Sequence, residues 1–196
     1  MAVPLALPSG RPARPRNLLN VATLVIVTGG TALFAALIAA YAGLAHFAKV
    51  WPPAGVTIDD YVGNMLALTA IMSAITVEWA WYSIKRDDPA QATWGLVLTA
   101  GFGASFVLLL WQLGRRAGFG PGTAKIGPFA VVYFALLGSI GLVALVGLVA
   151  VLMALARTIG RQFSSTNHEM LRATAWLWDF VVVCWIAIFA TIWFFT

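Results

Sequence analysis

The sequence predicts an all-α, polytopic membrane protein: a bundle of five transmembrane helices with its N-terminus in the cytoplasm. Of its 196 residues, 61% are hydrophobic and only 10% are charged, whereas soluble domains average about 45–50% apolar and about 25% charged residues. A membrane-spanning helix needs about 20 predominantly apolar residues. Five stretches meet this requirement, approximately Leu18–Ala45, Tyr61–Ile84, Ala92–Leu113, Gly127–Ala156 and Ala173–Phe195. The links between them are too short to hold a soluble domain.

The first span follows residues 1–17, which contain prolines and arginines but no continuous apolar stretch. We expect a flexible basic cytoplasmic tail there rather than a signal peptide, and a single membrane domain over residues 18–196. The "WPPAG" after this span is typical of an interfacial turn, because adjacent prolines cannot continue a helix and Trp51 can anchor at headgroup depth.

The fourth span carries small residues on more than one helical face: Gly138, Gly141, Gly147 and Ala150. Small residues let helix backbones approach closely in lipid, so we expect this helix to lie between neighbours. In the fifth span, Trp176 lies close to the expected cytoplasmic boundary, whereas Trp185 is expected deeper, in helix packing.

Basic residues indicate the orientation, since cytoplasmic links carry an excess of lysine and arginine. The side that holds the N-terminus carries twice as many as the other side. The first set is Arg11, Arg14, Arg16, Lys85, Arg86, Arg157, Arg161 and Arg172, and the second is Lys49, Arg115, Arg116 and Lys125. The net charge of +5 is therefore interpreted as a signal of membrane orientation, and no nucleic-acid partner is expected.

Two acids, Glu78 and Asp179, fall inside apolar spans. Each lies roughly 9 Å from the same predicted boundary, from the 1.5 Å rise per helical residue. Charges inside the membrane usually face protein or water and often mark functional sites. One interpretation is a proton-holding or headgroup-binding site on the cytoplasmic side. The other is that each carboxyl is hydrogen-bonded to a neighbouring Trp, Tyr or Thr, or reached by interfacial water.

The sequence offers no recognisable catalytic centre, and we expect no cofactor, no metal and no catalytic residue in this chain. Haem ligation usually requires histidines at membrane depth, but His46 ends the first span and His168 lies in the last link. The single cysteine, Cys184, cannot build a thiolate metal site. The "GFGPG" link at Gly118–Gly122 has no lysine at the position that a phosphate-binding loop requires.

The last span, "WLWDFVVVCWIAIFATIWFF", resembles the last helix of subunit III of the haem-copper cytochrome c oxidases. The matching positions are Trp178, Phe180, Val181, Trp185, Phe189 and Phe194. "VWPPAG" resembles that family's first external loop. "TVEWAWYSIKRDDPAQATWGLVLT" resembles its next helix, basic turn and following helix, and "FVLLLWQ", ending at Gln112, a further segment. The resemblance covers nearly the whole chain and corresponds to a divergent, short five-helix bacterial form.

Several polar positions of the family are replaced in this chain. An acid of the first retained helix corresponds to Gly30, a glutamate after the conserved glutamine corresponds to Arg115, and two histidines of the fourth helix correspond to Ile140 and Val143. In the last helix, Asp179 stands for a histidine and Val182 for an aspartate. Roles that depend on the missing groups are therefore not expected to transfer.

The resemblance implies a non-catalytic accessory subunit of a respiratory terminal oxidase, in a bacterial or archaeal cytoplasmic membrane. Its partners would be catalytic subunit I, subunit II and phospholipids, with haem and copper in the partner subunits. The candidate intramembrane polar, lipid or subunit contacts are Glu78, Asp179, Gln112, Trp51, Trp178 and Trp185. An accessory protein of nitric oxide reductase, a membrane assembly factor and a small transporter remain alternatives.

Overall fold

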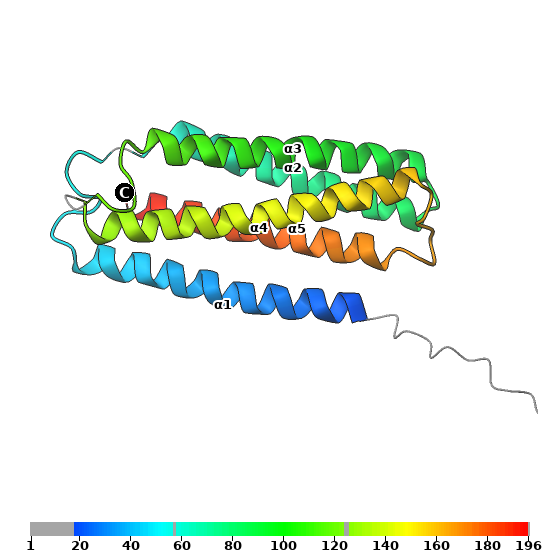
Figure 1. Ribbon diagram of the computed structural model, residues 1–196, viewed down its shortest axis with the longest axis horizontal. Coiled ribbons are helices and arrows are strands. Elements are labelled where there is room, and N and C mark those ends of the chain that lie inside the picture. The colour runs from blue at the N-terminus through cyan, green and yellow to red at the C-terminus, as the bar shows by residue number, and fades with distance from the viewer. Residues whose placement is uncertain (1–17, 57, 124–125, 196) are drawn as a thin grey trace, which may run out of the picture.

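The computed structural model describes residues 18–56, 58–123 and 126–195 and contains five long helices, each of which runs in the opposite direction to the one before it (Figure 1). The predicted tail at residues 1–17 lies outside the described residues. The helices are α1 (Leu18–Phe47), α2 (Asp60–Lys85), α3 (Pro89–Arg116), α4 (Pro128–Ile159) and α5 (Glu169–Phe194). All five are long and apolar enough to cross a membrane. The predicted fold class is therefore confirmed for the described part of the chain.

Helices α4 and α5 form the middle of the bundle. They contact one another, α1 contacts both of them, and on the other side α3 contacts α4 while α2 contacts α3 and α5 (Figure 1). The helix α1 is the most loosely enclosed, because only Thr23, Phe34 and Tyr41 are buried along it. The expectation that α4 lies between neighbours is confirmed by its contacts with three other helices.

Polar residues at the helix ends explain where the helices begin. The Asp59 carboxylate accepts a hydrogen bond from the Val62 amide at 3.1 Å, and the Asp88 carboxylate accepts one from Gln91 at 3.0 Å. Both satisfy amide groups that the first helical turn leaves unpaired. The helix α5 begins at Glu169, four residues before the predicted start at Ala173, because helical hydrogen bonding extends into the polar link that hydropathy excludes.

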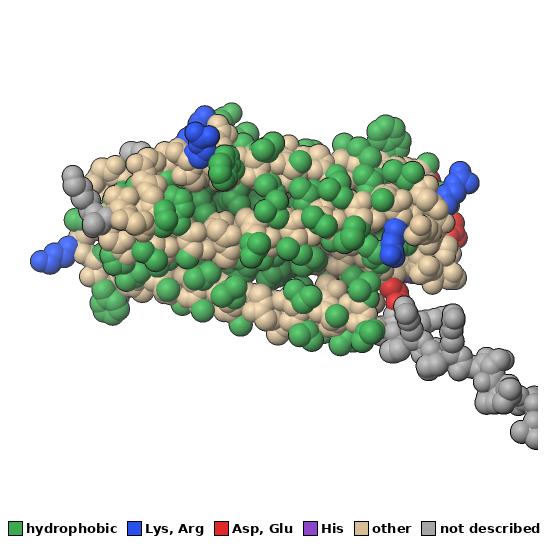
Figure 2. Space-filling model, in the orientation of Figure 1, with side chains coloured by type: hydrophobic (Ala, Val, Ile, Leu, Met, Phe, Trp, Pro, Cys, Tyr) green, Lys and Arg blue, Asp and Glu red, His purple; other side chains and the backbone are tan. Residues whose placement is uncertain are grey.

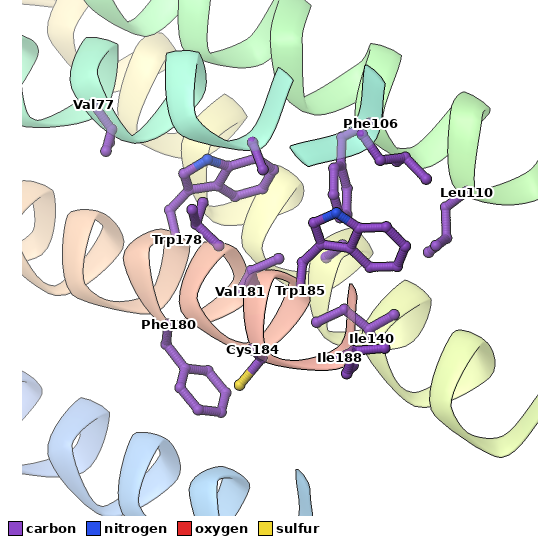
Figure 3. Packing of buried hydrophobic residues seen from close by; sticks show 14 of the residues in the cluster. Val77, Phe106, Leu110, Ile140, Trp178, Phe180, Val181, Cys184, Trp185 and Ile188 are labelled. Atoms are coloured by element: carbon purple, nitrogen blue, oxygen red, sulfur yellow. The ribbon is translucent and has the colours of Figure 1, made fainter. Parts of the chain in front are cut away.

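Aromatic side chains of α5 make up much of the core. Figure 3 shows Trp178 and Trp185 directed away from α1, towards α2 and α3, whereas Phe180 and Cys184 point towards α1. Trp178 passes between Gly103 of α3 and Gly147 of α4, where an added Cβ would lie within 3.0 Å of the indole. Its Nε1 donates a hydrogen bond to Ser73 Oγ of α2 at 2.9 Å. One side chain of α5 thus contacts three other helices.

The outer surface of the bundle is apolar, as a lipid environment requires. Figure 2 shows hydrophobic side chains over the middle of the visible face, with charged side chains nearer the two ends of the bundle. The exposed large hydrophobic residues are drawn from all five helices and include Val25, Ile75, Leu108, Leu142 and Val183.

Candidate functional site

The two intramembrane acids lie together, on the side where α2 packs against α5. The Arg172 guanidinium of α5 donates hydrogen bonds to both carboxylate oxygens of Glu78 on α2, at 2.9 and 3.1 Å. The carboxyl of Asp179 lies within hydrogen-bonding reach of Glu78 and close to Arg172. We call Glu78, Arg172 and Asp179 the acid–arginine cluster.

Aromatic rings hold the arginine of this cluster in place. The Arg172 guanidinium carbon lies 3.9 Å from the ring centroid of Trp81 and 5.1 Å from that of Trp176. Lys85 Nζ lies 4.5 Å from the Trp81 ring. A cation over an indole face is stabilised by the ring's electrostatics. Arg172 is therefore held by its two hydrogen bonds to the Glu78 carboxylate and by its contacts with two indole rings.

Helical spacing explains why these residues meet. Arg172, Trp176 and Asp179 follow one another at intervals of four and three residues, which places them on one face of α5. Glu78 and Trp81 are likewise three residues apart on α2. The same spacing is present in the sequence, but hydropathy places Arg172 in a link, where it counts only as an orientation signal. Its pairing with Glu78 is therefore not predicted.

The cluster can hold a proton or a polar neighbour. If both carboxyls are ionised, one arginine leaves one net negative charge. The side chains of Arg172 and Glu78 remain 26% and 39% exposed, and Asp179 is half-buried. The cluster thus reaches the lateral surface of the bundle, where a group from outside this chain can contact it.

The other candidate residues lie elsewhere. Trp178 and Trp185 are each 1% exposed and pack inside the bundle, with Trp185 edge-on to Phe106. Gln112 lies near the carboxyl end of α3, where its amide can accept a 2.8 Å hydrogen bond from the Arg116 guanidinium. None of these three residues belongs to the acid–arginine cluster.

Trp51 belongs to an aromatic group at the opposite end of the bundle from the cluster. It lies in the α1–α2 link and is half-buried. Its ring is 5.2 Å from that of Tyr41 and 5.0 Å from that of Phe129, both edge-on. Trp51 therefore connects the end of α1 to the beginning of α4.

The side chain of Phe180 on α5 explains why residue 30 of α1 is a glycine. A Cβ added to Gly30 would lie 2.6 Å from the Phe180 ring, and Phe180 also packs edge-on against Phe34 with centroids 5.9 Å apart. Any larger side chain at this position would displace the ring or the helix. The close approach of α1 to α5 thus requires a glycine where the resembled family has an acid.

Metal-binding groups do not come together in the described residues. No set of three histidine, cysteine, aspartate or glutamate side chains among them could hold a metal ion. His46 lies in the last turn of α1 and His168 at the N-terminus of α5, at opposite ends of the bundle. Cys184 is a buried free thiol.

Comparison with known proteins assigns the chain to a family. The family model for cytochrome c oxidase subunit III matches residues 16–196. Cytochrome c oxidase subunit 3 of Oncorhynchus mykiss and that of Locusta migratoria are each 33% identical over 144 residues, and that of Drosophila melanogaster is 32% identical over the same length. Each alignment covers 72% of this chain and 54% of the relative, so the chain spans about half the length of the curated relatives it matches. The chain belongs to the cytochrome c oxidase subunit III family.

Proposed function

We propose that this chain is a non-catalytic accessory subunit of a respiratory terminal oxidase, which stabilises the catalytic subunit and binds phospholipid. The observation that carries the proposal is the family match over residues 16–196. The five apolar helices and the exposed hydrophobic residues on their outer faces support it. Its partners would be catalytic subunit I and subunit II of a bacterial or archaeal cytoplasmic membrane, and these would carry the haem and copper.

Such a subunit would act through packing. Helices associate in lipid through close contact and interhelical hydrogen bonds rather than through a hydrophobic drive. A rigid apolar surface placed beside a catalytic subunit would hold its helices and the surrounding lipid, and would limit the access of water. The expected effect is on the durability of the complex rather than on its chemistry.

Deletion of the chain tests this proposal. The haem spectrum of the remaining complex should be unchanged, while activity during continuous turnover should decay faster, and restoring the gene should reverse this decay. A tagged copy should co-purify with haem- and copper-containing polypeptides. Loss of the haem signal from an assembled catalytic core, or a chain that purifies alone from native membranes, would contradict the proposal.

We further propose that the acid–arginine cluster is a polar contact between this bundle and a group outside the chain. Two observations support this proposal. The cluster lies on the lateral surface of the bundle, and it contains two carboxyls but only one arginine. The double variant Glu78→Gln with Asp179→Asn should weaken retention of the chain in the complex. Glu169→Gln, at the start of α5, is the matched control. Equal retention of both variants would leave the cluster only a role in joining α2 to α5.

A further inference from the structure

A groove runs between α3 and α4 on the lateral surface, apart from the acid–arginine cluster. It has a volume of about 550 Å³, within the range of roughly 300–1,000 Å³ typical of ligand pockets. Gly114, Gly138 and Gly141 contribute to its lining, with Trp111 and Phe134 among the larger lining side chains. A Cβ added to Gly138 would meet no atom within 4 Å. Gly138 therefore leaves space here that no side chain of the described chain fills.

The groove is as long as one leaflet of a bilayer. Along α4 its lining extends from Phe134 to Leu145, which is about 16 Å at 1.5 Å per residue. The hydrocarbon core of a bilayer is about 30 Å thick, so one leaflet accounts for about 15 Å. A single acyl chain needs only this length.

The polar end of the groove carries a positive charge. Among the residues that the structure describes, Arg115, in the last turn of α3, is the one charged residue that lines it. Its neighbour Arg116 is already paired with Asp59 at 2.9 Å, whereas Arg115 forms no ion pair or hydrogen bond within the described residues. Figure 2 shows basic side chains over the carboxyl-terminal part of α3, beside hydrophobic ones. The guanidinium is thus available to an external anion.

We propose that the α3–α4 groove binds one acyl chain of an anionic phospholipid, whose phosphate pairs with Arg115. Arginine binds phosphate through paired, charge-assisted hydrogen bonds, and the length and apolar lining of the groove suit the chain attached to that headgroup. This inference deepens the lipid-binding part of the proposed function by naming the site and the headgroup charge.

Native mass spectrometry of the purified full-length chain, together with any polypeptides that co-purify, tests the site. The protein is delipidated and then titrated with phosphatidylglycerol or with phosphatidylcholine. The unmodified chain should retain one phosphatidylglycerol in preference to phosphatidylcholine, because the choline cation of phosphatidylcholine balances its phosphate and leaves no net headgroup charge for Arg115 to neutralise. Arg115→Gln should reduce this preference about tenfold, the effect of losing one charge-assisted contact of about 1.4 kcal/mol, and Arg115→Lys should restore part of it. Arg157→Gln, an exposed arginine at the other end of the bundle, should have no effect.

A second pair of variants tests the apolar part of the groove. Gly138→Leu fills the space and should lower retention of phosphatidylglycerol, whereas Gly101→Leu, also at an open helical position, should not. Equal retention of the two lipids, or equal losses in target and control variants, would overturn the proposal. So would groove variants that release a co-purifying polypeptide while lipid retention is unchanged. If the chain retains the lipid but does not associate with an oxidase, the lipid site in the groove is supported and the proposed function is refuted.

Discussion

The contact between Trp178 and Gly103 allows a quantitative test of the packing. An alanine at Gly103 would place its Cβ 2.7 Å from Cη2 and 3.0 Å from Cζ2 of the Trp178 indole, and 3.1 Å from Leu148 Cδ1. The indole cannot retreat easily. Its opposite side faces Gly147, where an added Cβ would lie 2.9 Å from Cε3, and its Nε1 is held by Ser73. The substitution therefore forces α3 away from α5.

The expected magnitude follows from two opposing effects. Overpacking a rigid core costs about 1–3 kcal/mol, while replacing glycine by alanine inside a helix stabilises it by up to about 1 kcal/mol. Gly101 lies two residues away on the same helix, and a Cβ there would meet no atom within 4 Å. Gly103→Ala should therefore unfold with a free energy about 1–3 kcal/mol lower than that of Gly101→Ala.

The comparison can be measured in mixed micelles, by titrating a denaturing detergent and following helical circular dichroism for both variants. A double variant, Gly103→Ala with Trp178→Phe, removes the outer indole atoms that cause the collision. It should lose less stability than the sum of its two single variants, because the residues are in contact. Equal free energies of unfolding for Gly103→Ala and Gly101→Ala would refute the packing described for Trp178.

Two further predictions concern ion pairs. Arg172→Gln should lower the free energy of unfolding by about 1–2 kcal/mol in the same detergent titration. This is less than the roughly 3–5 kcal/mol of a fully buried pair, because both partners are partly exposed; adding Glu78→Gln should recover part of the loss, and no recovery would count against the pair. The Arg116 guanidinium and the Val62 amide lower the pKa of Asp59 in the folded protein. The Asp59 carboxylate therefore stabilises the fold fully above its unfolded pKa of about 3.9. This stabilisation is lost as the pH falls through the lower pKa of the folded state. Asp59→Asn should flatten this acid limb of the stability–pH profile, and an unchanged limb would contradict the assignment.

The spans could be predicted from the sequence because hydropathy and helix length depend on local composition. The carboxyl end of α3 and the start of α5 lie about one turn beyond the predicted spans, because polar residues such as Arg116 and Glu169 continue the helices past the apolar stretch. The similar depth of Glu78 and Asp179 was also predictable, since the rise per residue is fixed. Their contact was not, because it depends on how α2 and α5 are rotated about their axes when they pack.

Rotation about the helix axis also decides what the glycines do. Gly138, Gly141 and Gly147 were expected to face neighbouring helices. Gly147 accommodates Trp178, and a Cβ at Gly141 would approach Leu110 at 3.3 Å, but Gly138 faces open space. A glycine in a sequence is compatible with a close contact, but it does not identify the group that makes the contact. Only the packed bundle distinguishes a glycine at a helix contact from a glycine that lines a groove.

The position of α1 has a consequence for how the protein is made. Its contacts are with α4 and α5, which leave the ribosome only after α2 and α3 have been synthesised. During that interval α1 lacks its contacts with α4 and α5, and its high hydropathy allows it to remain in the bilayer without them. Insertion of individual helices thus precedes their association in this chain. Within this five-helix segment, α1 therefore completes its docking only after α5 has been inserted.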